Sequence, residues 1–349
     1  MRYNEPVTVA QLARFDEIID VRSEAEFALD HIPGAINCPV LNNEERIRVG
    51  TLYTQVSPFE AKKVGAALVS RNIARHLEEN LAQRPRNWKP LIYCWRGGTR
   101  SAAMAAVLQQ IGWRANRLEG GYKTYRSTVL ADLKAMPQRF DWRVVCGLTG
   151  GGKSRLLRAL ETQGAQVLDL EALAAHRGSV LGNLPGAPQP SQKMFDSRVW
   201  DGLRKFDPRR PVFVESESRK IGVLRTPETL IAAMWEARCI RLEAAVPLRV
   251  SMLLREYAHF AIDTAALGGQ LDRLVELHGH ERIASWKAMA AAGDGDTLVR
   301  ELLELHYDPA YARSILTHYK NLATAATLTV MADSEEDFAR LATACIAQG

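Results

Sequence analysis

Residues 93–101, YCWRGGTRS, place a cysteine just before two glycines and two arginines. The apolar run KPLIYC is typical of a buried strand, and the alanine-rich RSAAMAAVLQQIGW is typical of a helix that ends at Gly112. The glycines allow the backbone between strand and helix to turn its N–H groups toward the thiol of Cys94. Arg96 and Arg100 add positive charge, and all these features favour the thiolate. We therefore predict Cys94 to be catalytic, with Arg96 and Arg100 beside it.

This cysteine loop is compatible with more than one chemistry. Cys94 and Arg100 have the spacing of the cysteine phosphatases, but Tyr93 stands where those enzymes usually carry histidine. No evident loop supplies an aspartic general acid either. Cys94 could also be an inert thiol in a tight turn, but such a thiol would not need two neighbouring arginines. The remaining chemistry is the transfer of sulfur or selenium.

Two further segments resemble the rhodanese domain, which carries sulfur as a persulfide. Residues 18–37, IIDVRSEAEFALDHIPGAIN, resemble the rhodanese signature, and residues 118–126, LEGGYKTYR, resemble the stretch that follows the active-site helix of a rhodanese. The matching signature residues are Asp20, Val21, Arg22, Glu26, Phe27, His31, Ile32, Pro33, Gly34 and Ala35. The cysteine loop is one residue longer than the commoner rhodanese loop, which suits a group larger than one sulfur, such as a phosphate-type oxyanion.

A phosphate-binding motif, GLTGGGKS at residues 147–154, follows the apolar run VVC. It matches the P-loop pattern, in which backbone N–H groups cradle phosphates, the lysine reaches their outer oxygens and the serine can bind Mg²⁺. Glu215, at the end of a predicted strand, is expected to hold the magnesium water shell, with Asp169 and Glu217 as competitors for that role. The predicted phosphate-binding residues are Gly147, Thr149, Gly150, Gly151, Gly152, Lys153, Ser154, Glu215 and Arg219.

The ligand of this P-loop is not specified by its motif. The usual apolar run ending in aspartate is absent, which puts ordinary nucleotide hydrolysis in doubt. ATP binding and the binding of another diphosphate are both left open.

The motifs divide the chain into two predicted domains, residues 1–133 and residues 134–349, with a junction at residues 130–142. Strands alternate with helices in both, which predicts α/β folds with parallel sheets. The first is expected to be rhodanese-like. The second is expected to be P-loop NTPase-like with a largely helical part from Pro227 onward and a last strand in ATLTVMAD.

The composition adds few restrictions. The net charge of +5 permits a polyanionic partner without requiring one. The five cysteines include no CxxC pair, which disfavours a disulfide framework or a zinc site. The chain lacks an apolar run long enough for a membrane span and a signal-peptide pattern at its start, so we expect a cytoplasmic location without membrane association.

Seven stretches, in order, resemble the bacterial tRNA 2-selenouridine synthases: IIDVRSEAEFALDHIPGAIN, YCWRGGTRS, LEGGYKTYR, GLTGGGKS, DLEALAAHRGS, FVESESRKIG and HYDPAY. The resemblance implies a transferase that replaces the sulfur of wobble 2-thiouridine with selenium from selenophosphate. It also implies an S-geranylated intermediate made from geranyl diphosphate, with Mg²⁺ as cofactor. The expected partners are the anticodon arm of tRNA, bound by a monomer, and a selenophosphate-producing enzyme. The alternative is a sulfurtransferase fused to an ATP-dependent kinase-like domain that acts on a small molecule.

Two further surfaces would serve this chemistry. Candidate tRNA phosphate contacts are Arg177, Lys193, Arg198 and Lys220, although a solvated surface would show the same charges. The geranyl chain needs an apolar slot, and residues 252–262, MLLREYAHFAI, offer suitable side chains. An ordinary amphipathic helix would show the same pattern.

Overall fold

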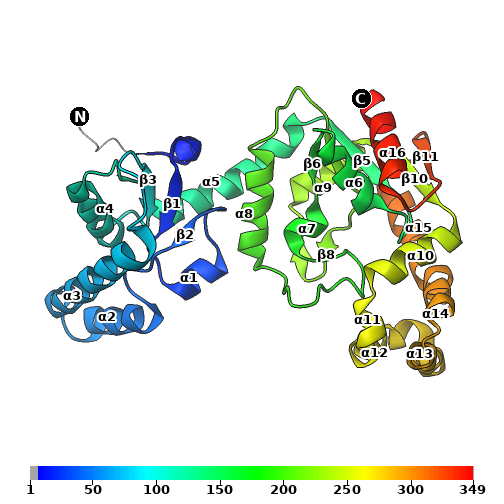
Figure 1. The fold of residues 1–349 in the computed structure, drawn as a ribbon, viewed down its shortest axis with the longest axis horizontal. Helices are drawn as coiled ribbons and strands as arrows, with labels where there is room; N and C mark the ends of the chain where they lie inside the picture. Colours follow the sequence, from blue (N-terminus) through cyan, green and yellow to red (C-terminus); the bar gives the residue numbers. More distant parts are fainter. Residues whose placement is uncertain (1–6, 349) are drawn as a thin grey trace. The chain divides into compact units, whose positions relative to one another are not determined.

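The computed structural model describes residues 7–348 (Figure 1). The chain forms two compact units: the first runs to Asp132 and includes Asp196–Arg198, and the second contains Leu133–Phe195 and the residues from Val199 onward. The division falls within helix α5 (Gly121–Ala135), next to the predicted border. We did not predict that residues 196–198 would group with the first unit.

The first unit is built on a four-stranded sheet with the order β2-β1-β3-β4. Its strands are β1 (Glu17–Asp20), β2 (Ile36–Asn37), β3 (Pro90–Tyr93) and β4 (Asn116–Arg117), and every pair is parallel. Its helices are η1 (Val9–Arg14), α1 (Glu24–Leu29), α2 (Asn43–Gln55), α3 (Pro58–His76), the π-helical turn η2 (Leu77–Leu81), α4 (Thr99–Ile111) and most of α5. The expected parallel α/β architecture is confirmed.

Strand β3 and helix α4 position the cysteine loop. All four residues of β3 are buried between β1 and β4, and Cys94 follows directly. Helix α4 begins after Gly98 and ends at Ile111, and the next residue, Gly112, has a φ of 104°, the left-handed conformation that favours glycine after a helix end. Ile92, Met104 and Leu108 pack in the same apolar core, so strand and helix hold the loop from both sides.

The second unit is built on a five-stranded parallel sheet with the order β11-β10-β5-β7-β6 and a separate hairpin, β8-β9. The strands are β5 (Trp142–Cys146), β6 (Gln166–Leu168), β7 (Val212–Glu215), β8 (Lys220–Ile221), β9 (Leu224–Arg225), β10 (Arg238–Ala244) and β11 (Ala326–Val330). The strand order changes direction at β5. In an open parallel sheet, ligands bind at the carboxyl ends of the strands beside such a switch point.

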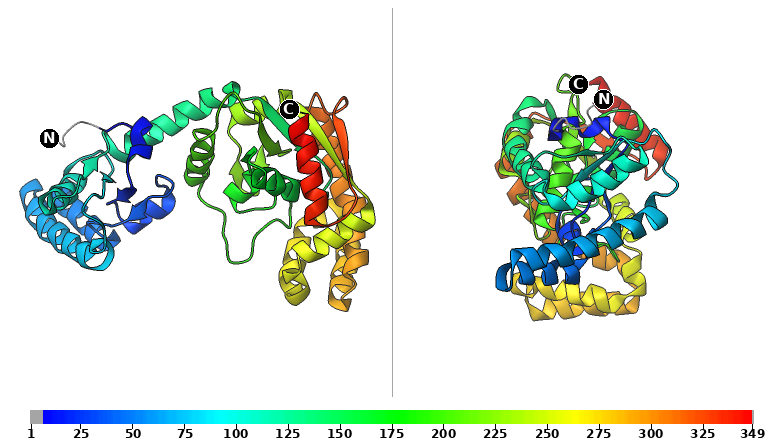
Figure 2. Two further views of the ribbon diagram at one scale, coloured as in Figure 1. Left: turned by 45° about the horizontal axis from the view of Figure 1, so that its top comes forward. Right: turned by 90° about the vertical axis from the view of Figure 1, so that its left-hand side faces the viewer.

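Helices cover the second sheet and extend beyond it. They are η3 (Met136–Arg139), α6 (Lys153–Thr162), α7 (Leu170–Ala174), α8 (Gln192–Leu203), α9 (Glu228–Glu236), α10 (Val246–Glu256), α11 (His259–Ile262), α12 (Thr264–Leu271), η4 (Asp272–Leu274), α13 (Val275–Ala292), α14 (Gly295–Leu302), η5 (Leu303–Tyr307), α15 (Asp308–His318) and α16 (Glu335–Ala347). Helices α6 and α16 pack together, and α9 packs against β5. Figure 2 shows the yellow and orange helices, α11 to α14, gathered in a bundle beyond the strands.

One strand of the second unit was not predicted. Strand β10, which pairs with both β5 and β11, lies in the part that we expected to be helical. Its sequence, RCIRLEA, is rich in residues with a high helix propensity, so local preference favours a helix. The segment is a strand because it pairs with a neighbouring strand on each side. The junction expected at residues 130–142 contains the boundary between the two units, and it consists of the end of α5 followed by the short helix η3.

Within residues 7–348, every helix is too short or too polar to span a lipid bilayer.

Candidate functional site

Cys94 lies at the carboxyl end of β3 with only 3% of its surface exposed. Its Sγ is 3.3 Å from the hydroxyl oxygen of Ser101, in the first turn of α4. The backbone N–H of Tyr122 donates to the carbonyl of Cys94 at 2.8 Å. Gly121 has a φ of 60°, and a Cβ there would collide with the same carbonyl oxygen, so the stretch LEGGYKTYR packs directly on the loop. The structure thus places the thiol in the expected turn, beside a hydroxyl group.

The two arginines of the loop have different surroundings. Arg100 donates to a carboxylate oxygen of Glu26 in helix α1 at 2.9 Å. Burial alone would raise the pKa of Glu26, but the hydrogen bond and charge of Arg100 lower it below its usual value. Arg96 is exposed and lines a shallow cavity, whose other walls are Gly120, Lys123, Thr124, Ser127 and Thr128. Arg100 therefore holds the loop to α1, whereas Arg96 faces open space.

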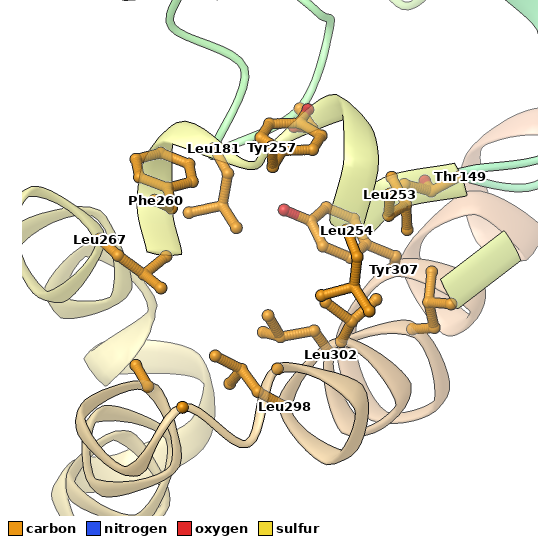
Figure 3. Close-up of a pocket in the computed structure, with 16 residues that line it drawn as sticks. Thr149, Leu181, Leu253, Leu254, Tyr257, Phe260, Leu267, Leu298, Leu302 and Tyr307 are labelled. Atoms are coloured by element: carbon orange, nitrogen blue, oxygen red, sulfur yellow. The ribbon is translucent and has the colours of Figure 1, made fainter. Parts of the chain in front are cut away.

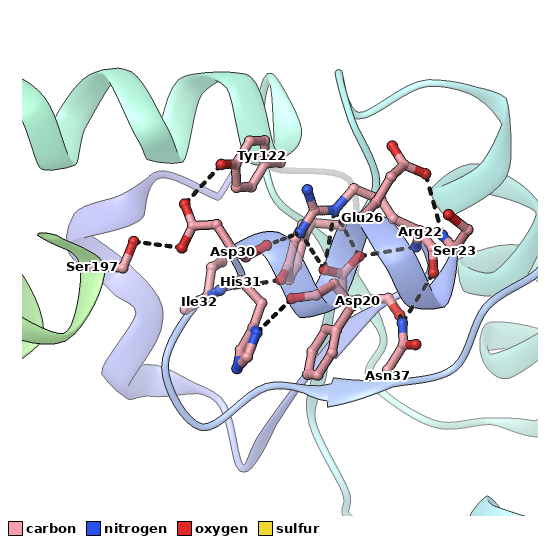
Figure 4. Close-up of polar contacts among 12 residues, drawn as sticks. Asp20, Arg22, Ser23, Glu26, Asp30, His31, Ile32, Asn37, Tyr122 and Ser197 are labelled. Carbon is pink, nitrogen blue, oxygen red and sulfur yellow. Dashed lines mark hydrogen bonds and ion pairs between the residues drawn. The ribbon is translucent and has the colours of Figure 1, made fainter. Parts of the chain in front are cut away.

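Residues of the rhodanese signature form a network of polar contacts with Tyr122 (Figure 4). Arg22 forms a buried ion pair with Asp20 at 2.6 Å and donates to the carbonyl of Asp30 at 2.6 Å. Its guanidinium lies 3.9 Å from the ring centroid of Tyr122, and the hydroxyl of Tyr122 donates to a carboxylate oxygen of Asp30 at 2.7 Å. Because Tyr122 also binds the carbonyl of Cys94, this buried network fixes the position of the cysteine.

The P-loop lies at the switch point of the second sheet. It connects β5 to α6, and Gly150 and Gly152 have φ values of 73° and 86°, which favour glycine. The ammonium of Lys153 donates to the carbonyl of Gly147 at 2.8 Å and is 3.5 Å from the carbonyl of Leu148. A bound phosphate would have to replace these contacts, because the lysine now folds back on its own loop.

Four acidic residues lie at the carboxyl ends of β6 and β7, next to the P-loop: Asp169, Glu171, Glu215 and Glu217. The hydroxyl of Ser154 donates to Glu171 at 3.1 Å, and the backbone N–H of Glu171 donates to Glu215 at 3.0 Å. Glu215 is 1% exposed. Burial, together with the charges of its acidic neighbours, raises the pKa of Glu215 well above its usual value. Burial and the charge of Glu171 also raise the pKa of Glu217.

The carboxylates of this acidic cluster are suitable ligands for a divalent cation. Oxygen atoms are the ligands that Mg²⁺ prefers, and Mg²⁺ is commonly held by few protein groups together with phosphates and water. One carboxylate oxygen of Glu215, Oε2, is buried and lacks a hydrogen-bond partner among the described residues. Within the same residues, no group of three or more His, Cys, Asp or Glu side chains is arranged to hold a metal ion alone. The site therefore suits a cation that arrives with a phosphate-bearing ligand.

The acidic cluster only partly matches our prediction. Glu215 lies near the P-loop but is fully buried, and Asp169 caps α7 by accepting from the N–H of Ala172 at 2.8 Å. Glu171, which contacts Ser154, was missed. Its only signal was its place in the stretch DLEALAAHRGS, because the distance from the P-loop along the chain hides the contact.

The motif HYDPAY was also left without a role, and the structure provides one. Arg249 forms a two-pronged ion pair with Asp308 at 2.9 and 2.6 Å, and its Nε donates to the carbonyl of Thr149 at 2.9 Å. The N–H of Gly147 donates to the hydroxyl of Tyr311 at 2.5 Å. Residues of α10 and α15 thus brace both ends of the first half of the P-loop.

The remaining predicted cations are spread over the surface. Arg219 lies 5.0 Å from the ring centroid of Trp235, and Arg177 donates to the carbonyl of Glu256 at 2.8 Å. Lys193 and Lys220 are exposed, and Arg198 is half-buried in a segment that groups with the first unit. The role of Arg219 in phosphate binding and the role of the other four cations in binding tRNA stay predictions.

Known proteins share both halves of this architecture. Residues 6–128 match the family model of the rhodanese-like domain, and residues 140–272 match that of the tRNA 2-selenouridine synthase AAA domain. The tRNA 2-selenouridine synthase of Bdellovibrio bacteriovorus is 32% identical over 91% of this chain and 79% of its own length. The enzyme of that name from Bordetella bronchiseptica is 33% identical over 91% of this chain and 92% of its own.

One solved structure, an N-terminal domain from Clostridium difficile 630, is 36% identical over 36% of this chain and 99% of its own, with a TM-score of 0.33. That score is too low to bear on the fold. The relatives from Bdellovibrio and Bordetella are similar over most of their length and of this chain, in both the cysteine-loop and P-loop halves. The chain therefore belongs to the tRNA 2-selenouridine synthase family.

Proposed function

We propose that this protein replaces the sulfur of 2-thiouridine, at the wobble position of tRNA, with selenium from selenophosphate. The replacement proceeds through an S-geranylated base made from geranyl diphosphate. The observation that carries the proposal is the pairing of a braced P-loop, bordered by an acidic cluster, with a cysteine loop in a separate unit. Two sites of such different chemistry suit a reaction in two steps.

In the first step, the sulfur of the base attacks C1 of the geranyl group. A carbon–sulfur bond forms, the C1–oxygen bond breaks with its electron pair on the diphosphate, and the base gives the proton of N3 to water. The N–H groups of the P-loop and the ammonium of Lys153 hold the diphosphate. Ser154 and Glu171 would hold Mg²⁺, which when bound would offset the charge of the leaving group.

In the second step, the selenium of selenophosphate attacks C2 of the base. The carbon–selenium bond forms, the carbon–sulfur bond breaks, and geranylthiolate leaves with the electron pair and takes a proton from water. Water then cleaves the selenium–phosphorus bond and releases phosphate. Selenium keeps its selenide oxidation state throughout, so the step needs no reductant. We assign the handling of this donor to Cys94, whose loop favours anions.

Reconstitution with purified full chain and an anticodon stem-loop carrying 2-thiouridine tests the proposal. Geranyl diphosphate and Mg²⁺ should give the geranylated base, and selenophosphate should then give 2-selenouridine, both detected by mass spectrometry of the nucleosides. Lys153→Ala should lower the rate of geranylation by at least about a hundredfold, because it removes a charged donor from the leaving group.

The same variant has a built-in control. Stem-loop that is geranylated beforehand should still be converted to 2-selenouridine by Lys153→Ala at a rate near that of the wild type. Unchanged geranylation in this variant would remove the P-loop from the mechanism. Rapid ATP turnover without any modified nucleoside would instead support the fusion of a sulfurtransferase with a small-molecule kinase.

A further inference from the structure

An apolar cavity lies beside the P-loop, inside the second unit (Figure 3). Its walls come from α10 to α14, from the turn η5, from residues 179 and 181 of the loop after α7, and from Thr149 of the P-loop itself. Among the residues that line it, only Thr149, Ser179, Tyr257 and Tyr307 carry hydroxyl groups, and the others are apolar or glycine. A cavity with this lining holds a hydrocarbon better than it holds water.

The size of the cavity indicates the size of its occupant. The centre of a water molecule can occupy a volume of about 160 Å³ in this cavity. This volume is at least ~10 times the volume that one water molecule needs. Protein interiors contain few voids larger than one water, so a cavity of this size calls for a ligand. The cavity therefore has room for a hydrocarbon chain larger than a few atoms.

The cavity adjoins the P-loop. Leu253 of α10 lines the cavity and also packs on the P-loop, where a Cβ on Gly150 would lie 2.7 Å from its Cδ1. One turn earlier in α10, Arg249 binds the carbonyl of Thr149. Figure 3 shows Thr149 and Leu253 at one end of the lining and Phe260 and Leu267 at the other. A ligand with its diphosphate in the P-loop can therefore extend its tail away from Thr149 toward Leu267.

We infer that this cavity binds the isoprenoid tail of an allylic diphosphate and that Leu267 limits the length of that tail. The inference rests on the proposed function, because it assigns the tail of the same diphosphate that the P-loop is proposed to hold. It goes further by naming the pocket and a residue that determines chain length. The segment that we considered for the geranyl chain, residues 252–262, supplies part of the wall through Leu253, Leu254, Tyr257 and Phe260.

The first experiment measures binding by calorimetry, with the full chain, Mg²⁺ and no tRNA. The wild type should bind geranyl diphosphate at least about tenfold more tightly than inorganic diphosphate, because the buried chain adds hydrophobic free energy. Leu298→Phe, which fills the cavity, should reduce this ratio severalfold while leaving the affinity for inorganic diphosphate unchanged. Leu277→Phe is the matched control: it makes the same change at a side chain of α13 that is 71% exposed and outside the cavity.

The second experiment tests length selection through a gain of binding. Leu267→Ala should lengthen the cavity and raise the affinity for farnesyl diphosphate, relative to geranyl diphosphate, by about tenfold or more. Leu271→Ala removes the same atoms one turn further along α12, from a buried residue outside the cavity, and should leave this preference unchanged. If both variants gain the preference, the bundle is merely loosened and the inference is wrong. If neither gains it, the tail lies elsewhere.

These binding results are independent of catalysis. If the protein binds geranyl diphosphate tightly and selectively for chain length but does not geranylate the stem-loop, the proposed reaction is refuted and the inferred binding pocket is supported. Geranylation by the wild type with an unchanged binding ratio in Leu298→Phe would keep the reaction and refute the pocket.

Discussion

The hydroxyl of Ser154 donates to Glu171 Oε2 at 3.1 Å, which links the P-loop to the acidic cluster at the ends of β6 and β7. The P-loop serine is a magnesium ligand in the P-loop pattern, so its hydrogen-bond acceptor influences how a cation is held. Glu171 in turn donates its backbone N–H to the buried Glu215. The acidic cluster thus reaches the phosphate site through one side-chain contact.

Glu171→Gln should weaken the binding of Mg²⁺. The substitution removes the negative charge next to Ser154, and the loss of such a supporting group typically costs about 10–100-fold in metal affinity or activity. The measurement is the Mg²⁺ concentration that gives half of the maximal geranylation rate. Glu161→Gln, at an exposed position of α6, is the control. An equal Mg²⁺ requirement in both variants would argue against a role for Glu171.

Cys94→Ser should separate the two proposed steps. Serine lacks the sulfur atom to which we assign the handling of the selenium donor, so the rate of 2-selenouridine formation should fall by at least about 10³. Geranylation, assigned to the other unit, should continue at a rate close to that of the wild type. Nucleoside mass spectrometry of one reaction mixture measures both products. If geranylation were lost together with selenation in a folded variant, the assignment of one step to each unit would be wrong.

The pair of Arg249 and Asp308 should stabilise the P-loop as well as the second unit. Arg249 is 1% exposed, and its removal leaves a carboxylate and the carbonyl of Thr149 without their donor. Because Asp308 is 27% exposed, water offsets part of the loss, and we expect Arg249→Met to lower the free energy of unfolding by about 2–3 kcal/mol. Diphosphate binding, measured in the same variant, should weaken too.

Urea unfolding of the full chain, followed by a probe in the second unit, measures this loss. The control is Lys287→Met, which breaks the exposed ion pair with Asp272 in the same unit and should cost less than about 1 kcal/mol. In a double-mutant cycle of Arg249→Met with Asp308→Ala, the double variant should lose less free energy of unfolding than the two single variants lose in sum. Strict additivity would show that the ion pair contributes nothing.

The buried Glu215 should make stability fall as the pH rises. Its pKa in the folded protein is raised above the ordinary value of 4.5, first by burial and then by the charges of Asp169, Glu171 and Glu217. Below the ordinary value of 4.5, the carboxyl group of Glu215 is protonated in both the folded and the unfolded chain. Above it the unfolded chain releases the proton first, so the folded state loses relative stability until the raised pKa is passed.

Glu215→Gln removes this titration and can keep the bond from the N–H of Glu171. Relative to the wild type, the variant should gain stability over the pH range above 4.5, because the glutamine does not titrate. Thermal unfolding of both proteins across this range, without divalent cations, gives the difference. Parallel pH profiles would contradict a raised pKa at Glu215.

Local sequence patterns predicted much of the fold. The strands that end at Asp20, Tyr93, Cys146 and Glu215 lie where apolar runs meet polar or glycine-rich turns, and both loops that carry chemistry follow such a strand. Strand β10 escaped detection because its leucine, alanine, glutamate and arginine residues favour helices when taken alone. Its pairing with β5 and β11 is a property of the assembled sheet.

For the candidate sites, too, some residues could be predicted from local sequence patterns and others only from the tertiary structure. The sequence by itself determined Cys94 and the P-loop as candidate sites, because a cysteine loop of this kind and a phosphate-binding motif each combine several residue types within one short segment. Only the tertiary structure decided that Glu171 meets Ser154, that Arg249 and Tyr311 brace the P-loop, and that Leu253 and Leu267 line one apolar cavity. These contacts join residues far apart along the chain, and their distances follow from the packing of whole helices and strands, which no local pattern records.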